Sequence, residues 1–152
     1  MNAVADLSTL SGIERLRAIF AGRTGYEGIV KTFDLRPVSA EEGFVVFEGS
    51  PTKAVYNPLG SVHGGYAATL LDTVMACAVH SRLNAGQTYT TLELKIAYHR
   101  ALTDSSGPVR AEGRVVSHGK RAAFAEGKLF DKDGTLCATA TTTCLVFTKE
   151  KI

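Results

Sequence analysis

One carboxylate lies in a predominantly apolar stretch of this 152-residue sequence. Residues 64–82 are rich in Ala, Leu and Val, and Asp72 is their only acidic side chain. Burying an unpaired carboxylate costs several kcal/mol, which is comparable with the whole spare stability of a domain. Asp72 therefore has either a structural hydrogen-bond partner or a chemical task, and helix geometry alone favours neither.

A glycine pair begins the same stretch and gives it a second chemical group. Gly64 and Gly65 offer backbone N–H groups without side-chain obstruction, at the positive end of a long predicted helix. Such an end binds anions and polarises carbonyl oxygens, and glycine permits a substrate to approach closely. A simple loop-to-helix hinge uses the same residues. The glycine pair together with a carboxylate two turns later indicates a site.

Helix geometry adds a constraint on how these two groups cooperate. Asp72 follows Gly64 by eight residues, so the two groups lie roughly 12 Å apart along one helix axis. One helix cannot bring both to a single carbonyl group. Two such helices packed antiparallel across a twofold axis can, because each lends its N-terminus to the aspartate of the other. The spacing therefore predicts a homodimer with two composite sites.

The rest of the sequence predicts elements that would position this helix. We expect an N-terminal helix at 8–21, with Ser8 or Ser11 as its N-cap, and a helix at 64–82 that is apolar on all sides and therefore buried on all sides. Strands are expected at 26–34, 43–49, 89–102, 109–117, 121–130 and 135–147, with connections at 37–42 and 50–61. This order predicts a single α+β domain over residues 1–152, with a curved, mainly antiparallel sheet wrapped around one long central helix.

Composition excludes several classes of function. The net charge of +2 is too small for a nucleic-acid-binding protein, although the slight excess of Lys and Arg suits a small polyanion such as a nucleotide. The three cysteines have no metal-type spacing, and the four histidines lack partners at metal spacing, so we expect no metal and reduced thiols in a cytoplasmic protein. We also expect no signal peptide and no membrane association.

Residues 57–65, with the sequence Asn-Pro-Leu-Gly-Ser-Val-His-Gly-Gly, are followed by Leu-Leu-Asp at 70–72. This pattern resembles the hotdog-fold thioesterases, and within them the phenylacetate-degradation type. Residues 91–98 are similar to the strand that follows the helix in that family. The resemblance covers residues 26–147 and implies the hotdog fold.

The resemblance also implies roles for individual residues. Gly64 N–H would bind the thioester carbonyl oxygen, and Asp72 of the facing protomer would act as general base or as nucleophile. Asn57 would orient water or the carbonyl, His63 would support the loop, and Thr91 would help to position water. Thr91 alternates with outward-facing residues, so this role requires a β-bulge or a position at the dimer edge. We expect Tyr66, Leu71 and Met75 to contribute to the acyl pocket, and His80 to interact with the helix dipole.

The implied substrate is an acyl or aryl-acyl thioester of coenzyme A, with acyl carrier protein thioesters as a second class. Coenzyme A is part of the substrate, so no separate cofactor is expected. Its phosphates would meet Gly65 and the turn formed by His118, Gly119, Lys120 and Arg121. The assembly would be a homodimer and often a homotetramer. Two alternatives stay open, namely an acyl-thioester hydratase or dehydratase of the same fold, and a non-catalytic acyl-coenzyme A binding module.

Overall fold

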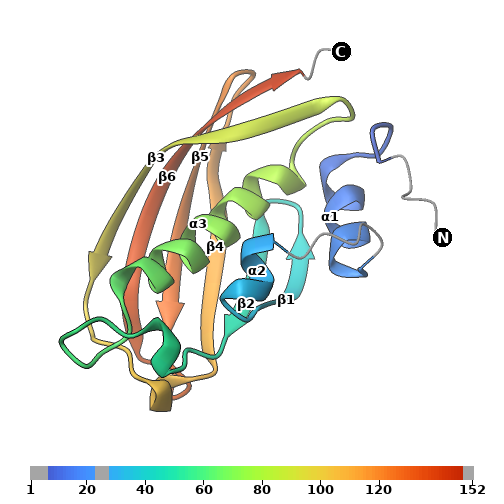
Figure 1. Ribbon diagram of the computed structural model, residues 1–152. Coiled ribbons are helices and arrows are strands. Elements are labelled where there is room, and N and C mark those ends of the chain that lie inside the picture. The colour runs from blue at the N-terminus through green and yellow to red at the C-terminus, as the bar shows by residue number, and fades with distance from the viewer. Residues whose placement is uncertain (1–6, 23–27, 149–152) are drawn as a thin grey trace.

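The computed structural model describes residues 7–22 and 28–148 (Figure 1). The α-helices are α1 (Gly12–Phe20), α2 (Gly28–Thr32) and α3 (Gly64–Ser81), and short 3-10 turns are η1 (Lys53–Val55) and η2 (Asp104–Ser106). The strands are β1 (Leu35–Glu41), β2 (Phe44–Gly49), β3 (Gln87–Tyr98), β4 (Val109–His118), β5 (Ala122–Phe130) and β6 (Leu136–Thr148). Within the described ranges, no helix combines the length and the hydropathy needed to cross a bilayer.

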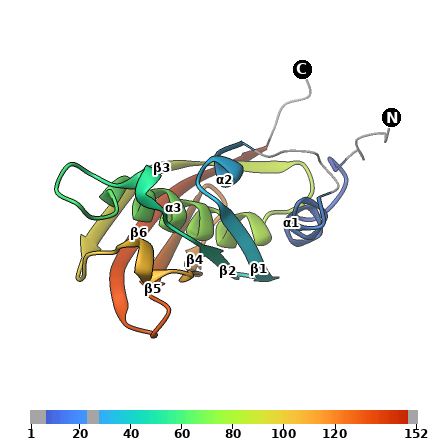
Figure 2. The same ribbon diagram turned by 60° about the horizontal axis from the view of Figure 1, so that its bottom comes forward.

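The six strands form one antiparallel sheet in the order β1-β2-β4-β5-β6-β3. The sheet curves around α3, which crosses its concave face, while α1 packs beside the C-terminal end of α3 (Figures 1 and 2). This arrangement confirms the predicted α+β fold with a curved antiparallel sheet around one long helix. The limits of α3 and of β2, β4, β5 and β6 agree with the predictions to within two residues.

The sheet comes closest to α3 at Gly113, in the middle of β4. A Cβ atom at Gly113 would overlap the carbonyl oxygen of Val74 and would lie 2.8 Å from the backbone nitrogen of Met75. These are backbone atoms of a helix, so they cannot rotate away as a side chain can. The absence of a side chain at Gly113 therefore sets the distance between helix and sheet, and Leu70, Leu71 and Val74 become fully buried around this contact.

The prediction that α3 is buried on every side is wrong for the single chain. Asp72, Thr73 and Cys77 are only partly buried, and they form a stripe along one side of α3. The physical reason is that the curved sheet covers only part of the helix circumference. The uncovered side carries the carboxylate, so Asp72 is half-buried rather than enclosed in the core.

The N-terminal third departs from the prediction in two places. Residues 28–32 form a short helix rather than part of a strand at 26–34, while residues 26 and 27 lie outside the described residues. Residues 35–41 form β1 at one edge of the sheet, although a connection was predicted at 37–42. Most β1 side chains are exposed, so β1 lacks the apolar alternation that reveals a half-buried strand, and an edge position tolerates Pro37. The predicted N-terminal helix is confirmed as α1, but it begins only at Gly12, after the N-cap Ser11, rather than at residue 8.

A β-bulge in β3 resolves the side-chain alternation of that strand. The pairing of β3 with β6 shifts between Thr91 and Glu93. Before the bulge, Tyr89 and Thr91 point toward α3, whereas after it Leu94 and Ile96 pack against the core. Leu92 lies at the change of parity and is 62% exposed. Of the two explanations expected for Thr91, a β-bulge or a position at the dimer edge, the structure shows the bulge.

The contact at Gly113 gives a stability test. Gly113→Ala should lower the free energy of unfolding by about 2–3 kcal/mol, because the added methyl group forces the helix backbone away from the sheet. Urea unfolding monitored by circular dichroism measures this change. The control is Ser117→Ala on the exposed part of the same strand, which should change the free energy by less than about 0.5 kcal/mol. Equal stability of the two variants would contradict the packing described.

Candidate active site

Asp72 lies on the uncovered side of α3, at the edge of a cavity of about 710 Å³. The Thr91 hydroxyl donates a hydrogen bond to Asp72 Oδ1 at 3.2 Å. The bulge in β3 turns Thr91 toward the helix, so it also explains how this contact forms. The structure therefore brings together two of the predicted site residues and fixes one carboxylate oxygen, which leaves the other oxygen available to a ligand.

The cavity beside Asp72 is apolar along most of its length, and the described residues that line it include no second charged side chain. Its apolar lining comes mainly from α1, α2 and β2, through Leu16, Ile19, Phe20, Ile29, Val30 and Phe47. The prediction that Tyr66, Leu71 and Met75 line the acyl pocket is wrong for this cavity. Their side chains point from α3 into the sheet and are at most 1% exposed, so they belong to the core.

The position of α1 as one wall of the cavity depends on Gly12, its first residue. The Gly12 N–H donates a hydrogen bond to the Leu83 carbonyl at 2.8 Å, just beyond the end of α3. A Cβ atom at Gly12 would overlap the His80 carbonyl oxygen. The start of α1 thus touches the backbone of α3 directly, and α1 extends from this contact along the cavity.

The titratable groups that line the cavity next to Asp72 are held in their neutral forms. Burial, followed by the nearby Asp72 carboxylate, raises the pKa of Cys77 to about 12, and burial also raises the pKa of Tyr89. Burial and then the Arg15 charge lower the pKa of His80 to about 4. His80 is therefore uncharged at neutral pH, and the expected charge interaction of His80 with the helix dipole is wrong. The Asp72 carboxylate lies beside these neutral groups and is the charged side chain among the described residues that line the cavity.

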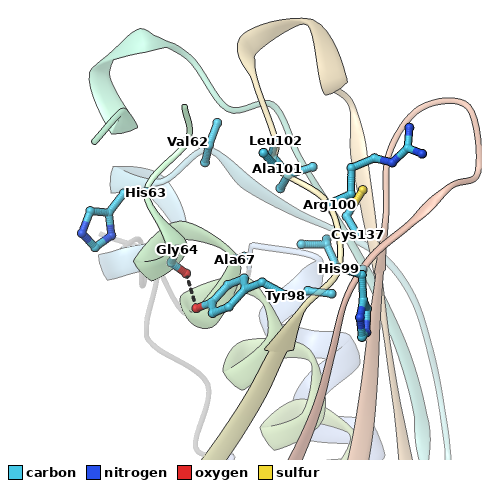
Figure 3. A pocket seen from close by; sticks show the side chains of 12 residues that line it. Val62, His63, Gly64, Ala67, Tyr98, His99, Arg100, Ala101, Leu102 and Cys137 are labelled. Carbon is cyan, nitrogen blue, oxygen red and sulfur yellow. Dashed lines mark hydrogen bonds between the residues drawn. The ribbon is translucent and has the colours of Figure 1, made fainter. Parts of the chain in front are cut away.

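The N-terminus of α3 has a precise hydrogen-bond arrangement. His63 is the N-cap, and its Nδ1 accepts a hydrogen bond from the Gly65 N–H at 2.8 Å. The Tyr98 hydroxyl donates to the Gly64 carbonyl at 2.9 Å, as Figure 3 shows. Among the described residues, no acceptor is present for the Gly64 N–H. Gly65, predicted to contact coenzyme A, thus uses its N–H within the chain, whereas the Gly64 N–H is available.

Gly64 and Asp72 line different cavities of the same chain. Gly64 and His63 border a second cavity of about 320 Å³, which also involves Tyr98 and Arg100 (Figure 3). Asp72 does not line this second cavity, and Gly64 does not line the first. The separation agrees with the helix geometry, which places these groups roughly 12 Å apart along one axis.

Asn57 forms the turn that precedes the helix. Its Oδ1 accepts hydrogen bonds from the N–H groups of Leu59 at 2.9 Å and Ser61 at 3.3 Å, and its Nδ2 donates to the Ser61 hydroxyl at 3.1 Å. Asn57 lines neither of the two cavities described above. In the single chain it therefore shapes the loop that leads to His63.

The predicted phosphate-binding turn connects β4 to β5. Lys120 and Arg121 are exposed there, and Gly119 closes the turn through its N–H to the Ala122 carbonyl at 2.8 Å. His118 is partly buried at the end of β4. Strand register places His118 opposite Ala123, Ala123 opposite Cys144, and Cys144 opposite Thr91. The turn therefore lies on the same transverse row as Thr91, about 14 Å away across three strand spacings.

Two contributors were absent from the sequence-based prediction. Tyr98 contacts the start of α3, but an aromatic residue at the end of a strand does not by itself predict such a contact. The walls formed by α1 and α2 were missed because their apolar residues are equally typical of core packing. The stripe of apolar residues on α1 was the one sequence signal for this wall. It does not show which of these residues line a cavity and which pack in the core.

The depressed pKa of His80 gives a prediction about pH. The unfolded chain binds a proton at His80 near pH 6.5, whereas the folded chain does so only near pH 4, so the stabilising contribution of neutral His80 is lost as the pH falls through this window. In His80→Gln this contribution is absent. The difference in unfolding free energy between wild type and variant should therefore shrink by about 1–2 kcal/mol from pH 7 to pH 5 in urea titrations. A difference that is the same at both pH values would contradict a neutral, buried His80.

Comparison with known proteins places this architecture in a family. The family model described as the thioesterase superfamily matches residues 59–138. The proofreading thioesterase EntH of Klebsiella pneumoniae is 31% identical over 99 residues, which cover 65% of this chain and 71% of that protein. The phenylacetic acid degradation-related protein of Ralstonia eutropha JMP134 is 28% identical with a TM-score of 0.78, covering 86% of this chain and 98% of that one.

The PaaI protein of E. coli, from the phenylacetic acid degradation operon, shares the fold at 19% identity and a TM-score of 0.77, covering 90% of this chain and 96% of that one. The family match includes Gly64, Asp72 and Thr91 together with the strands that support them. The resemblance to the hotdog-fold thioesterases is thereby confirmed. The chain belongs to the thioesterase superfamily, has its hotdog fold, and is a thioester hydrolase.

Proposed function

We propose that the protein hydrolyses an acyl-coenzyme A thioester to the free acid and coenzyme A, at composite sites in a homodimer. The observation that carries this proposal is the position of Asp72. Among the described residues, it is the one charged side chain that lines an apolar cavity of about 710 Å³, and the Thr91 hydroxyl fixes one of its oxygens. An apolar acyl group fits such a cavity, and a carboxylate at its edge meets the thioester carbon.

The oxyanion donor in this proposal is the Gly64 N–H of the second protomer. This N–H lies at the positive end of an 18-residue helix and has no acceptor within the described residues. A backbone donor at a helix N-terminus stabilises the negative charge that develops on the carbonyl oxygen during attack. Because Gly64 and Asp72 border different cavities in one chain, a second copy is needed to supply the missing partner.

Strand β3 offers the surface for this second copy. It lies at one edge of the sheet and is 12 residues long, and its exposed side chains include Leu92 at 62% and Tyr98 at 56%. The free backbone groups of a long edge strand are a template for pairing with another chain. Twofold pairing of β3 with its copy would place the two α3 helices antiparallel, as the composite site requires. Tetramers would form by further association of such dimers.

The reaction follows from these groups in either of two ways. As a general base, Asp72 takes a proton from water while the water oxygen attacks the thioester carbon. As a nucleophile, Asp72 attacks that carbon itself, and water then cleaves the resulting mixed anhydride. In both cases Gly64 N–H binds the oxyanion, the carbon–sulfur bond breaks, and the thiolate leaves and takes up a proton as coenzyme A.

The coenzyme A moiety would extend from the thioester toward the turn at residues 118–121. Lys120 and Arg121 are exposed there and have the chemistry to bind phosphate. The turn shares a transverse row of the sheet with Thr91, so a substrate that lies along this row reaches both. Asn57 and His63 would support the loop that carries the oxyanion donor.

Asp72→Asn tests the carboxylate. The substitution keeps the shape and the Thr91 contact but removes the base and nucleophile, so kcat should fall by at least about 100-fold. Thiol release from acetyl-, octanoyl- and phenylacetyl-coenzyme A measures the effect, and circular dichroism verifies the fold. Near-normal hydrolysis by the variant would show that the assignment of Asp72 is wrong.

Mixing two inactive variants tests the shared site. Gly64→Pro removes the N–H at the first helical position, where proline is tolerated, and should lower kcat by about 10²–10³-fold. A heterodimer of Asp72→Asn and Gly64→Pro protomers contains one intact composite site, so random mixing should restore about a quarter of wild-type activity. Gly64→Ala, which adds a Cβ atom but keeps the N–H, is the matched control. Failure of the mixture to exceed either parent would contradict sharing.

Substitution in α1 tests the location of the acyl group. Ile19→Trp fills part of the cavity, so kcat/KM for octanoyl- or phenylacetyl-coenzyme A should fall about tenfold or more, with less than about a twofold change for acetyl-coenzyme A. The control is Arg17→Trp, which places the same side chain on the exposed side of α1. An equal loss for all acyl lengths would place the acyl group elsewhere.

A further inference from the structure

One peptide group at the start of α3 is held at both of its ends. The Gly64–Gly65 peptide receives a hydrogen bond at its carbonyl oxygen from the Tyr98 hydroxyl at 2.9 Å, and its N–H donates to His63 Nδ1 at 2.8 Å. The two contacts come from different parts of the chain, since His63 is the N-cap of the helix and Tyr98 ends β3. Figure 3 shows the Tyr98 ring beside Gly64 with its hydroxyl directed at this carbonyl.

These two hydrogen bonds restrict a glycine pair whose backbone would otherwise rotate readily. Two successive glycines have more backbone freedom than any other pair, so a Gly-Gly helix start is readily displaced. The next peptide toward the N-terminus carries the free Gly64 N–H, and its direction depends on the rotation about the Gly64 backbone. A donor that stabilises an oxyanion must already point at the carbonyl before reaction. Restraint of the glycine pair therefore preorganises the donor.

Tyr98 also packs against the same residue. A Cβ atom at Gly64 would lie 3.0 Å from the Tyr98 hydroxyl oxygen and 3.1 Å from the ring carbon that bears it. The ring thus occupies the space next to the Gly64 Cα atom that any other residue would fill with its side chain. Strand pairing holds the base of Tyr98 in place, because Tyr98 lies opposite Ala138 of β6. The ring and the hydroxyl together fix the backbone at Gly64.

We propose that Tyr98 is a positioning residue, which acts through the Gly64–Gly65 peptide to hold the oxyanion-binding Gly64 N–H in its reactive direction. The proposal rests on the proposed function of Gly64. Without the Tyr98 hydroxyl, the start of α3 would remain formed, since His63 still caps it, but the direction of the Gly64 N–H would vary. The expected consequence is a loss in the chemical step rather than in substrate binding or in folding.

The test compares Tyr98→Phe with Tyr66→Phe. Both remove one phenolic oxygen, but the Tyr66 hydroxyl is buried and has no hydrogen-bond partner among the described residues, so it offers a matched control on α3 itself. In Tyr98→Phe, kcat should fall about 3- to 10-fold with KM changed less than about twofold, which corresponds to the loss of one neutral hydrogen bond. Amide hydrogen exchange of Gly65, measured by NMR, should accelerate by a similar factor. Tyr66→Phe should leave both quantities unchanged.

The exchange measurement separates this proposal from the proposed function. Absence of thioester hydrolysis by the wild-type protein would refute the function, while the Gly65 exchange rate would still decide whether Tyr98 restrains the helix start. Unchanged Gly65 exchange in Tyr98→Phe would overturn the proposal, even if kcat fell. A fall in kcat accompanied by a large drop in the thermal unfolding midpoint would overturn it as well, because Tyr98 would then have only a structural role. Faster Gly65 exchange with a lower kcat, an unchanged KM and an unchanged midpoint would support it.

Discussion

Direct contact between the backbone of α3 and the sheet at Gly113 determines much of this structure. Because β4 has no side chain at that point, the helix lies against the sheet at Val74 and Met75. The contact fixes the rotation of α3 about its own axis. Leu70 and Leu71 consequently face the sheet, whereas Asp72 faces the side that the sheet leaves open. A packing constraint in the core thus decides on which side of α3 the Asp72 carboxylate lies.

The elements that depend on local sequence could be predicted with good accuracy. The long helix, its glycine start and the four strands after it have strong periodicity and clear turns, and Asp72 stands out because its neighbours are apolar. The bulge at Thr91 could also be anticipated, because the residue has the wrong parity for a role at the site. Each of these inferences uses residues that are close together in sequence.

The parts that could not be predicted depend on contacts between distant segments. Residues 28–32 contain β-branched residues that favour a strand, yet they fold as a short helix at the edge of the cavity. Strand β1 is largely exposed, so its sequence shows no buried face. The contact between Tyr98 and Gly64 joins residues 34 positions apart, and no sequence pattern in either segment predicts it. Hydrophobicity alone also could not separate Leu71, a core residue, from Ile19, a cavity residue.

The direct contact of Gly12 with the end of α3 has a consequence for how such a protein diversifies. The proposed reacting groups belong to α3 and β3, whereas a large part of the apolar wall belongs to α1 and α2. The first residue of α1 contacts the backbone at the end of α3 directly. Mutations in α1 and α2 can therefore change the shape of the proposed acyl cavity without moving Asp72 or Thr91. Because the wall and the proposed reacting groups lie on separate elements, a change in the acid that the cavity accepts does not require a change in α3 or β3.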